Sequence, residues 1–236
     1  KYHLILFVFF SLFSSFSISA QTNKVFSPNT LEKIIESEQS FKQEQITSIQ
    51  LAPTGNYDVV YQRLALGLNP EVVYIQGNVT TYFKPLLASI ASVAFDLTDS
   101  LEVDSVFYHQ TKVTAFTQTK DVLQINFPSP VSQLDSISVF YHGIPPRTGF
   151  GSFNRSYHDS VPVLWTLSEP YGARDWWPCK MTLTDKIDSI DIFVTTLSKY
   201  KAGSNGLLVE TLQANDTCTY HWKHRYPIAT YLVGIA

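Results

Sequence analysis

The chain has little charge and almost no cysteine or methionine. Charged side chains make up 16% of its 236 residues, and it contains only two Cys and one Met. No long run of Lys or Arg is present, so nucleic acid is not expected as a partner. An exported protein could pair Cys179 with Cys218, but we expect two separate buried thiols.

Sequence motifs of metal-binding and phosphate-binding sites are also absent. The sequence contains no H-E-x-x-H, no paired C-x-x-C and no phosphate-binding glycine loop. His221 and His224 are three residues apart, and in a strand this odd separation places the two rings on opposite faces. We therefore predict no metal site in this chain.

Short strand-like segments recur from residue 57 onward, with turn residues between them. Aromatic residues make up 14% of the chain, which is typical of a globular, strand-rich protein. The pattern favours a mainly β fold, an antiparallel multi-stranded β-sandwich or barrel, over an alternating α/β fold. We expect a long loop over 145–160 and a core-type strand over 226–236. The other predicted strands are 57–66, 72–83, 92–97, 103–108, 113–116, 122–127, 135–141, 189–196, 207–211 and 217–224.

The first 50 residues differ from the rest. Residues 1–20 are predicted to be a signal peptide, with a basic start at Lys1, an apolar run over 4–16 and a cleavage site before Gln21. The apolar run is shorter than the roughly 20 residues of a membrane span, so an uncleaved anchor is the weaker alternative. Residues 21–50 form a polar lead-in with a short helix, and 51–236 form the β domain. We expect an exported protein that is periplasmic, on the cell surface or secreted, with no membrane span after cleavage.

Residues 165–181, WTLSEPYGARDWWPCKM, combine three Trp with four charged residues. Trp is mostly buried, whereas charged residues are rarely buried unless they are paired. The stretch is therefore either a polar knot in the core, with Glu169 paired to Arg174, or one wall of a binding cleft. Pro170 favours extended backbone at Glu169, and a carboxylate held on a cleft wall would bind a substrate ammonium by charge-assisted hydrogen bonds.

The same stretch resembles the N-terminal domain of the zinc aminopeptidases related to aminopeptidase N and leukotriene-epoxide hydrolase, the gluzincin metallopeptidases. The sequence of this stretch is most similar to those of exported family members from Bacteroidetes-type bacteria. The resemblance covers the chain from about Tyr57 to its last residue. It is carried by EPYGARDWWPC at 169–179 and supported by Asp185-Lys186, Val194-Thr195, Ser204-Asn205-Gly206 and the segment 226–232.

The resemblance implies a saddle-like β domain and a role for Glu169. In that family, a Glu or Gln five residues before an Arg holds the free N-terminal amine of the substrate, and Glu169 lies five residues before Arg174. A cis peptide bond after this residue is also implied. Leu167 replaces a Gln that lines the first side-chain pocket in the family, which would make that pocket more apolar. Many family members have Asp where this chain has Met181.

The resemblance further implies a catalytic domain that this chain lacks. In the family, the zinc motif, the third zinc ligand, the G-x-M-E-N loop and the transition-state Tyr all lie further on. We therefore expect no catalytic residue here, with zinc bound by the missing domain of the parent enzyme. The expected function is the substrate-anchoring domain of an exported zinc metalloaminopeptidase that acts on peptides with a free N-terminus. The alternative is a non-catalytic, secreted β-sandwich binding module.

Overall fold

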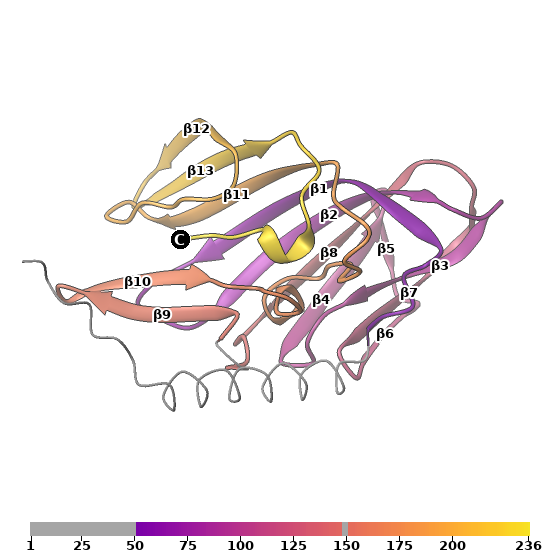
Figure 1. Ribbon diagram of the computed structural model, residues 1–236, viewed down its shortest axis with the longest axis horizontal. Coiled ribbons are helices and arrows are strands. Elements are labelled where there is room, and N and C mark those ends of the chain that lie inside the picture. The colour runs from indigo at the N-terminus through magenta and orange to yellow at the C-terminus, as the bar shows by residue number, and fades with distance from the viewer. Residues whose placement is uncertain (1–50, 148–150) are drawn as a thin grey trace, which may run out of the picture. The chain divides into compact units, whose positions relative to one another are not determined.

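The computed structural model describes residues 51–147 and 151–236, and most of this part of the chain is in strands. The strands form three sheets (Figure 1), so the prediction of a mainly β, multi-stranded fold is confirmed. The predicted signal peptide and the helical lead-in lie outside the described residues. No helix in the described part is long and apolar enough to cross a membrane.

Eight strands form the large sheet, in the order β12–β13–β11–β1–β2–β8–β4–β5. Neighbouring strands run antiparallel except β1 and β11, which are parallel. The sequence does not predict this parallel pair, because it depends on the long crossover connection that leads into β11. The bounds are β1 (Tyr57–Leu68), β2 (Ile75–Pro85), β4 (Leu101–Tyr108), β5 (Thr111–Val113), β8 (Asp135–Gly143), β11 (Ser189–Leu197), β12 (Leu207–Ala214) and β13 (Thr217–His224).

A second sheet of three strands, in the order β3–β7–β6, faces the inner side of the large sheet. It consists of β3 (Ile90–Asp96), β7 (Val122–Val131) and β6 (Phe116–Thr119). The single strand predicted over 113–116 is therefore wrong. Val113 ends β5 in the large sheet, whereas Phe116 starts β6 in the smaller one, so the chain crosses between the sheets inside the predicted strand.

A hairpin of β9 (Phe153–His158) and β10 (Val161–Thr166) forms the third sheet. The prediction of one long loop over 145–160 is wrong for its second half, which contains β9. Asp159 and Ser160 form the turn with φ of 47° and 68°. Positive φ at both central residues is what the favoured two-residue hairpin turns require.

The segment 226–236 is not the predicted strand. Only Ile228 and Ile235 form isolated bridges, to Ile187 and Ser204 respectively, and the 3-10 turn η2 (Thr230–Leu232) lies between them. Because the two bridges pair with different parts of the chain, the segment does not form a continuous strand with either.

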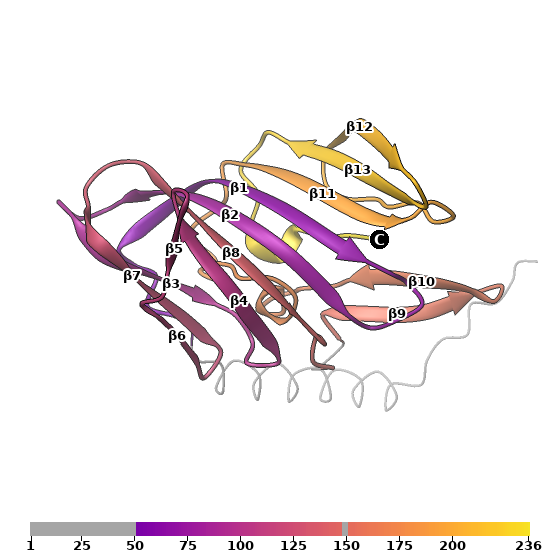
Figure 2. The ribbon, with the colours of Figure 1, turned by 180° about the vertical axis from the view of Figure 1, so that it is seen from behind.

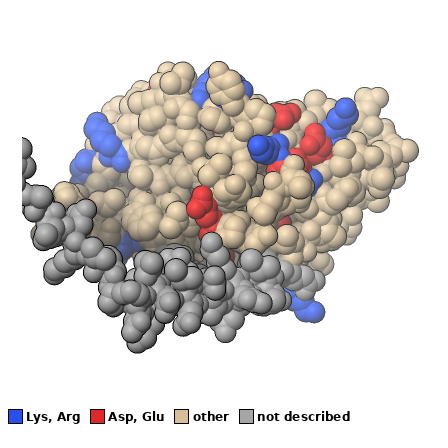
Figure 3. Space-filling view, viewed as in Figure 1, with Lys and Arg blue, Asp and Glu red and all other residues tan. Residues whose placement is uncertain are grey.

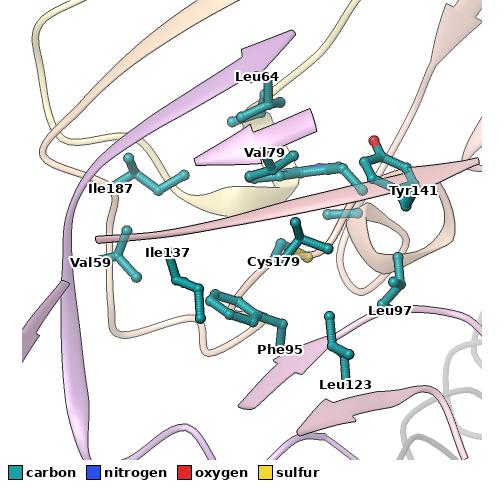
Figure 4. Packing of buried hydrophobic residues seen from close by; sticks show 14 of the residues in the cluster. Val59, Leu64, Val79, Phe95, Leu97, Leu123, Ile137, Tyr141, Cys179 and Ile187 are labelled. Carbon is teal, nitrogen blue, oxygen red and sulfur yellow. The ribbon is translucent and has the colours of Figure 1, made fainter. Parts of the chain in front are cut away.

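The core lies between the large sheet and the three-stranded sheet. Figure 4 shows Val79 and Ile137 of the large sheet facing Phe95 and Leu123 of the smaller one, with Cys179 of the Trp-rich stretch between them. All five side chains are at most 1% exposed. The Trp-rich stretch is thus inserted into the core, which fixes its position.

Both cysteines are free and buried, which confirms the prediction. Burial, with a contribution from the nearby Asp96, raises the pKa of the Cys179 thiol well above its ordinary value. A thiol kept protonated is a poor nucleophile, so Cys179 serves packing.

A buried carboxylate joins three strands on the outer face of the large sheet. Asp191 is 5% exposed and accepts hydrogen bonds from His221 Nε2 (2.5 Å) and Arg225 (2.8 Å). The His221 ring stacks on Phe193, with centroids 3.9 Å apart. Burial alone would raise the pKa of Asp191, but hydrogen bonds from His221, Arg225 and Tyr61 hold it below its ordinary value.

Asp191→Asn should lower the free energy of unfolding at pH 7 by about 1.5–3 kcal/mol, the usual contribution of a hydrogen bond to a charged group. The folded pKa lies below the ordinary 3.8, so the ionised carboxylate stabilises the fold above that value. This stabilisation is lost as the pH falls through the folded pKa. Urea unfolding should show the difference from wild type shrinking below about pH 3.8. The exposed Asp216→Asn is the control, and an undiminished difference at pH 3 would contradict the account.

Candidate functional site

Glu169 lies on the loop between β10 and the 3-10 turn η1 (Ala173–Asp175). Its side chain is exposed and makes no hydrogen bond or ion pair with the residues that the structure describes. Arg174 forms an ion pair with Asp121 (3.4 Å) rather than with Glu169. The polar knot that would join Glu169 to Arg174 is therefore not formed.

The other charged residues of the Trp-rich stretch are paired within the fold. Arg174 contacts Asp121, the buried Asp175 accepts a hydrogen bond from Ser152, and the buried Lys180 forms an ion pair with Asp185. Within the described part of the chain, Glu169 alone among the four has its charge left for an outside partner.

Hydrogen bonds fix the backbone on both sides of Glu169. The Leu167 N–H donates to Ser152 O (3.0 Å), and the Gly172 N–H donates to Ser168 O (2.8 Å), which closes the loop. Trp176 Nε1 donates to Ser168 Oγ (2.9 Å). The Glu169–Pro170 bond is cis, as the resemblance implied. The hydrogen bonds at Leu167, Ser168 and Gly172 hold the backbone on both sides of Glu169, whose carboxylate is accessible.

Ser152 is a site residue that the sequence does not predict. It lies at the start of the hairpin, in the segment expected to be a loop, and its hydroxyl donates to Asp175 Oδ2 (2.6 Å). The two residues are 23 positions apart, and no local pattern links them.

Gly172 packs so closely on Ser152 that a larger residue would clash. A Cβ at Gly172 would lie 2.1 Å from Ser152 Oγ and 2.9 Å from its Cβ. We expect Gly172→Ala to lower the free energy of unfolding by about 1–3 kcal/mol, the usual cost of overpacking. Gly55→Ala is the matched control, because no atom lies within 4 Å of its added Cβ. Thermal unfolding of both variants tests this, and equal melting temperatures would contradict it.

Leu167 lies two residues before Glu169 and is 44% exposed. The structure therefore brings both predicted site residues together on one exposed loop. Both side chains are exposed, so a ligand can reach them.

The described residues do not fit a zinc site. Across 51–147 and 151–236, no group of three or more His, Cys, Asp or Glu side chains could hold a metal ion, whereas catalytic zinc needs three protein ligands. His221 is bound to Asp191 instead.

On the face shown in Figure 3, the visible charges lie in small separate groups of both signs.

The model of the Peptidase M1 N-terminal domain family matches residues 54–232, from three residues before β1 to the end of η2. The chain belongs to this family. The match includes the large sheet, the Trp-rich stretch and Glu169. The comparison with curated proteins finds no match.

Solved M1 structures share the fold of this M1 N-terminal domain. The M1 zinc metallopeptidase from Deinococcus radiodurans matches with a TM-score of 0.69 and 22% identity, over 79% of this chain and 42% of that one. A mutant of it bound to a Tyr-Ser-Ala substrate gives 0.68 and 22%, over 77% and 42%. Leukotriene A4 hydrolase from Saccharomyces cerevisiae gives 0.63 and 20%, over 76% and 28%. The chain spans less than half the length of each.

Met181 bonds to two other parts of the M1 N-terminal domain. The Arg174 N–H donates to Met181 Sδ (3.3 Å), at the position where many family members were expected to have Asp. The Met181 N–H in turn donates to the buried Asp96 (3.0 Å). The sulfur therefore accepts a bond for which a carboxylate would be the stronger acceptor.

Proposed function

We propose that this M1 N-terminal domain is the substrate-anchoring part of an exported zinc metalloaminopeptidase. The observation that carries the proposal is the accessible Glu169 carboxylate in the Trp-rich stretch 165–181, whose other charged residues are all paired. Its role would be to bind the α-ammonium group of a peptide with a free N-terminus.

The chemistry of this contact explains cleavage at the first residue. A carboxylate and an ammonium form short charge-assisted hydrogen bonds. Holding the ammonium at Glu169 would place the first peptide bond at one fixed distance from the loop. Leu167, on the same loop, would contact the first side chain of the substrate through an apolar surface.

Zinc and the groups that activate water would come from a catalytic domain, which would be the partner of this domain. This part of the proposal rests on the greater length of the M1 relatives, one of which is bound to a Tyr-Ser-Ala substrate. Zinc would supply Lewis-acid activation of water. Export rests on the predicted signal peptide over 1–20.

The test is an assay of the complete protein that contains this chain. It should hydrolyse leucine 4-nitroanilide and leave the N-acetylated compound intact, and 1,10-phenanthroline should abolish the activity until zinc is restored. A folded protein with no activity on a panel of free-amine substrates would overturn the proposal. That result would favour the non-catalytic binding module.

A further inference from the structure

The segment 232–236 lies between the Ser204-Asn205 pair and Thr166, which leads into the loop that carries Glu169. In Figures 1 and 2 this segment, in yellow, passes from η2 between β10 and the large sheet. It has no ladder of its own, and hydrogen bonds from both sides hold it in place.

One side of the segment is held by residues 203–205. The Gly203 N–H donates to Ala236 O (2.7 Å) and the Ala236 N–H donates to Gly203 O (3.0 Å), while the side chains of Ser204 and Asn205 bond residues earlier in the segment. Asn205 Nδ2 donates to Leu232 O (3.0 Å), and Asn205 Oδ1 accepts from the Gly234 N–H (2.7 Å). Ser204 Oγ donates to Gly234 O (2.7 Å). One amide side chain therefore satisfies two backbone groups that are two residues apart, which fixes the path of the segment beyond η2.

The other side of the segment holds the end of β10. The Thr166 N–H donates to Ile235 O (3.0 Å), and Thr166 Oγ1 accepts from the Ile235 N–H (3.0 Å). Ile235 is 4% exposed, so this contact is anchored in the core. Thr166 directly precedes Leu167 and lies three residues before Glu169.

We propose that Asn205 is a positioning residue for the amine-binding loop. Its amide fixes Gly234, the adjacent Ile235 fixes Thr166, and Thr166 sets where the loop carrying Glu169 begins. The proposal rests on the proposed function of Glu169. It assigns a role to Ser204 and Asn205 of the Ser204-Asn205-Gly206 pattern.

Asn205→Ala leaves the Gly234 N–H and Leu232 O without these partners and should loosen the loop. Part of the charge-assisted bond to the ammonium would be lost, which raises KM for free-amine substrates about 5- to 10-fold. This bond forms before the transition state, so kcat should change less than about twofold. A merely structural role would lower the amount of folded enzyme, and hence apparent kcat, without changing KM.

The experiment compares three variants of the complete protein with wild type. Asn205→Asp keeps an acceptor for Gly234 and should give an intermediate KM. Asn126→Ala, an exposed Asn in β7, should leave KM unchanged. An unchanged KM in a folded Asn205→Ala protein would overturn the positioning role.

Amide hydrogen exchange separates this proposal from the proposed function. The Leu167 amide, bonded to Ser152 O, should exchange about 10-fold faster in Asn205→Ala, while Ile125 in β7 keeps its wild-type rate. If the wild-type protein is inactive, the proposed function is wrong, but the exchange rate of the Leu167 amide still tests the positioning role of Asn205. An unchanged rate at Leu167 overturns the positioning role, and a faster rate supports it.

Discussion

Replacing Glu169 by Ala should lower kcat/KM of the complete protein for free-amine peptides by about 10- to 100-fold. This range corresponds to about 1.5–3 kcal/mol, the contribution of a hydrogen bond to a charged group. The effect should appear mainly in KM, because the ammonium is bound in both the ground state and the transition state. Steady-state kinetics with leucine 4-nitroanilide measure it.

Two further variants separate the kinetic effect of the Glu169 charge from a general effect of removing a surface carboxylate. Glu169→Gln keeps a hydrogen-bond acceptor without the charge and should fall between wild type and Glu169→Ala. Glu102→Ala removes an exposed carboxylate on β4, whose side chain is 79% exposed, and should leave the kinetics unchanged. A loss below about threefold in Glu169→Ala would contradict ammonium binding, because it is less than one such hydrogen bond contributes.

Trp176→Ala should lower the free energy of unfolding by about 3–5 kcal/mol, the usual cost of truncating a buried Trp. The side chain is fully buried, and the Trp176 carbonyl accepts a hydrogen bond from the Tyr141 hydroxyl (2.8 Å). The neighbouring backbone carries η1, so the loop would be destabilised together with the core. Urea unfolding measures the loss.

The two adjacent tryptophans provide a matched comparison. Trp176 Nε1 donates to Ser168 Oγ, whereas Trp177 Nε1 is buried without a partner among the described residues. Trp176→Phe should therefore cost about 1 kcal/mol more than Trp177→Phe, the net value of one hydrogen bond. Equal costs would show that the Ser168 bond does not hold the loop.

Alternation along the strands made most of the fold predictable. Leu64 and Leu66 point inward from β1, and Arg63 and Ala65 lie on the other face, as a half-buried strand requires. The parallel pairing of Arg63 with Asp191 was not predictable, since it joins strands far apart in the sequence. The β9–β10 turn was missed because Asp159-Ser160 lacks the glycine that usually marks such a turn.

Only two kinds of feature of the candidate site were predictable from the sequence. These were the features that depend on residues close together in the chain and those that the family resemblance implies. The resemblance led to Glu169 and to the cis bond after it. The contacts that hold the loop come from residues distant in sequence, such as Ser152 to Asp175 and Thr166 to Ile235. No periodicity encodes these pairs, because each depends on the packing of separate segments.

The most direct test of ammonium binding is a crystal structure of the complete protein with a tripeptide that has a free N-terminus. We expect the N-terminal nitrogen of the peptide about 2.7–2.9 Å from a carboxylate oxygen of Glu169, the distance of a charge-assisted hydrogen bond. A bound tripeptide whose ammonium is held by other residues, with Glu169 beyond about 3.5 Å, would contradict this expectation.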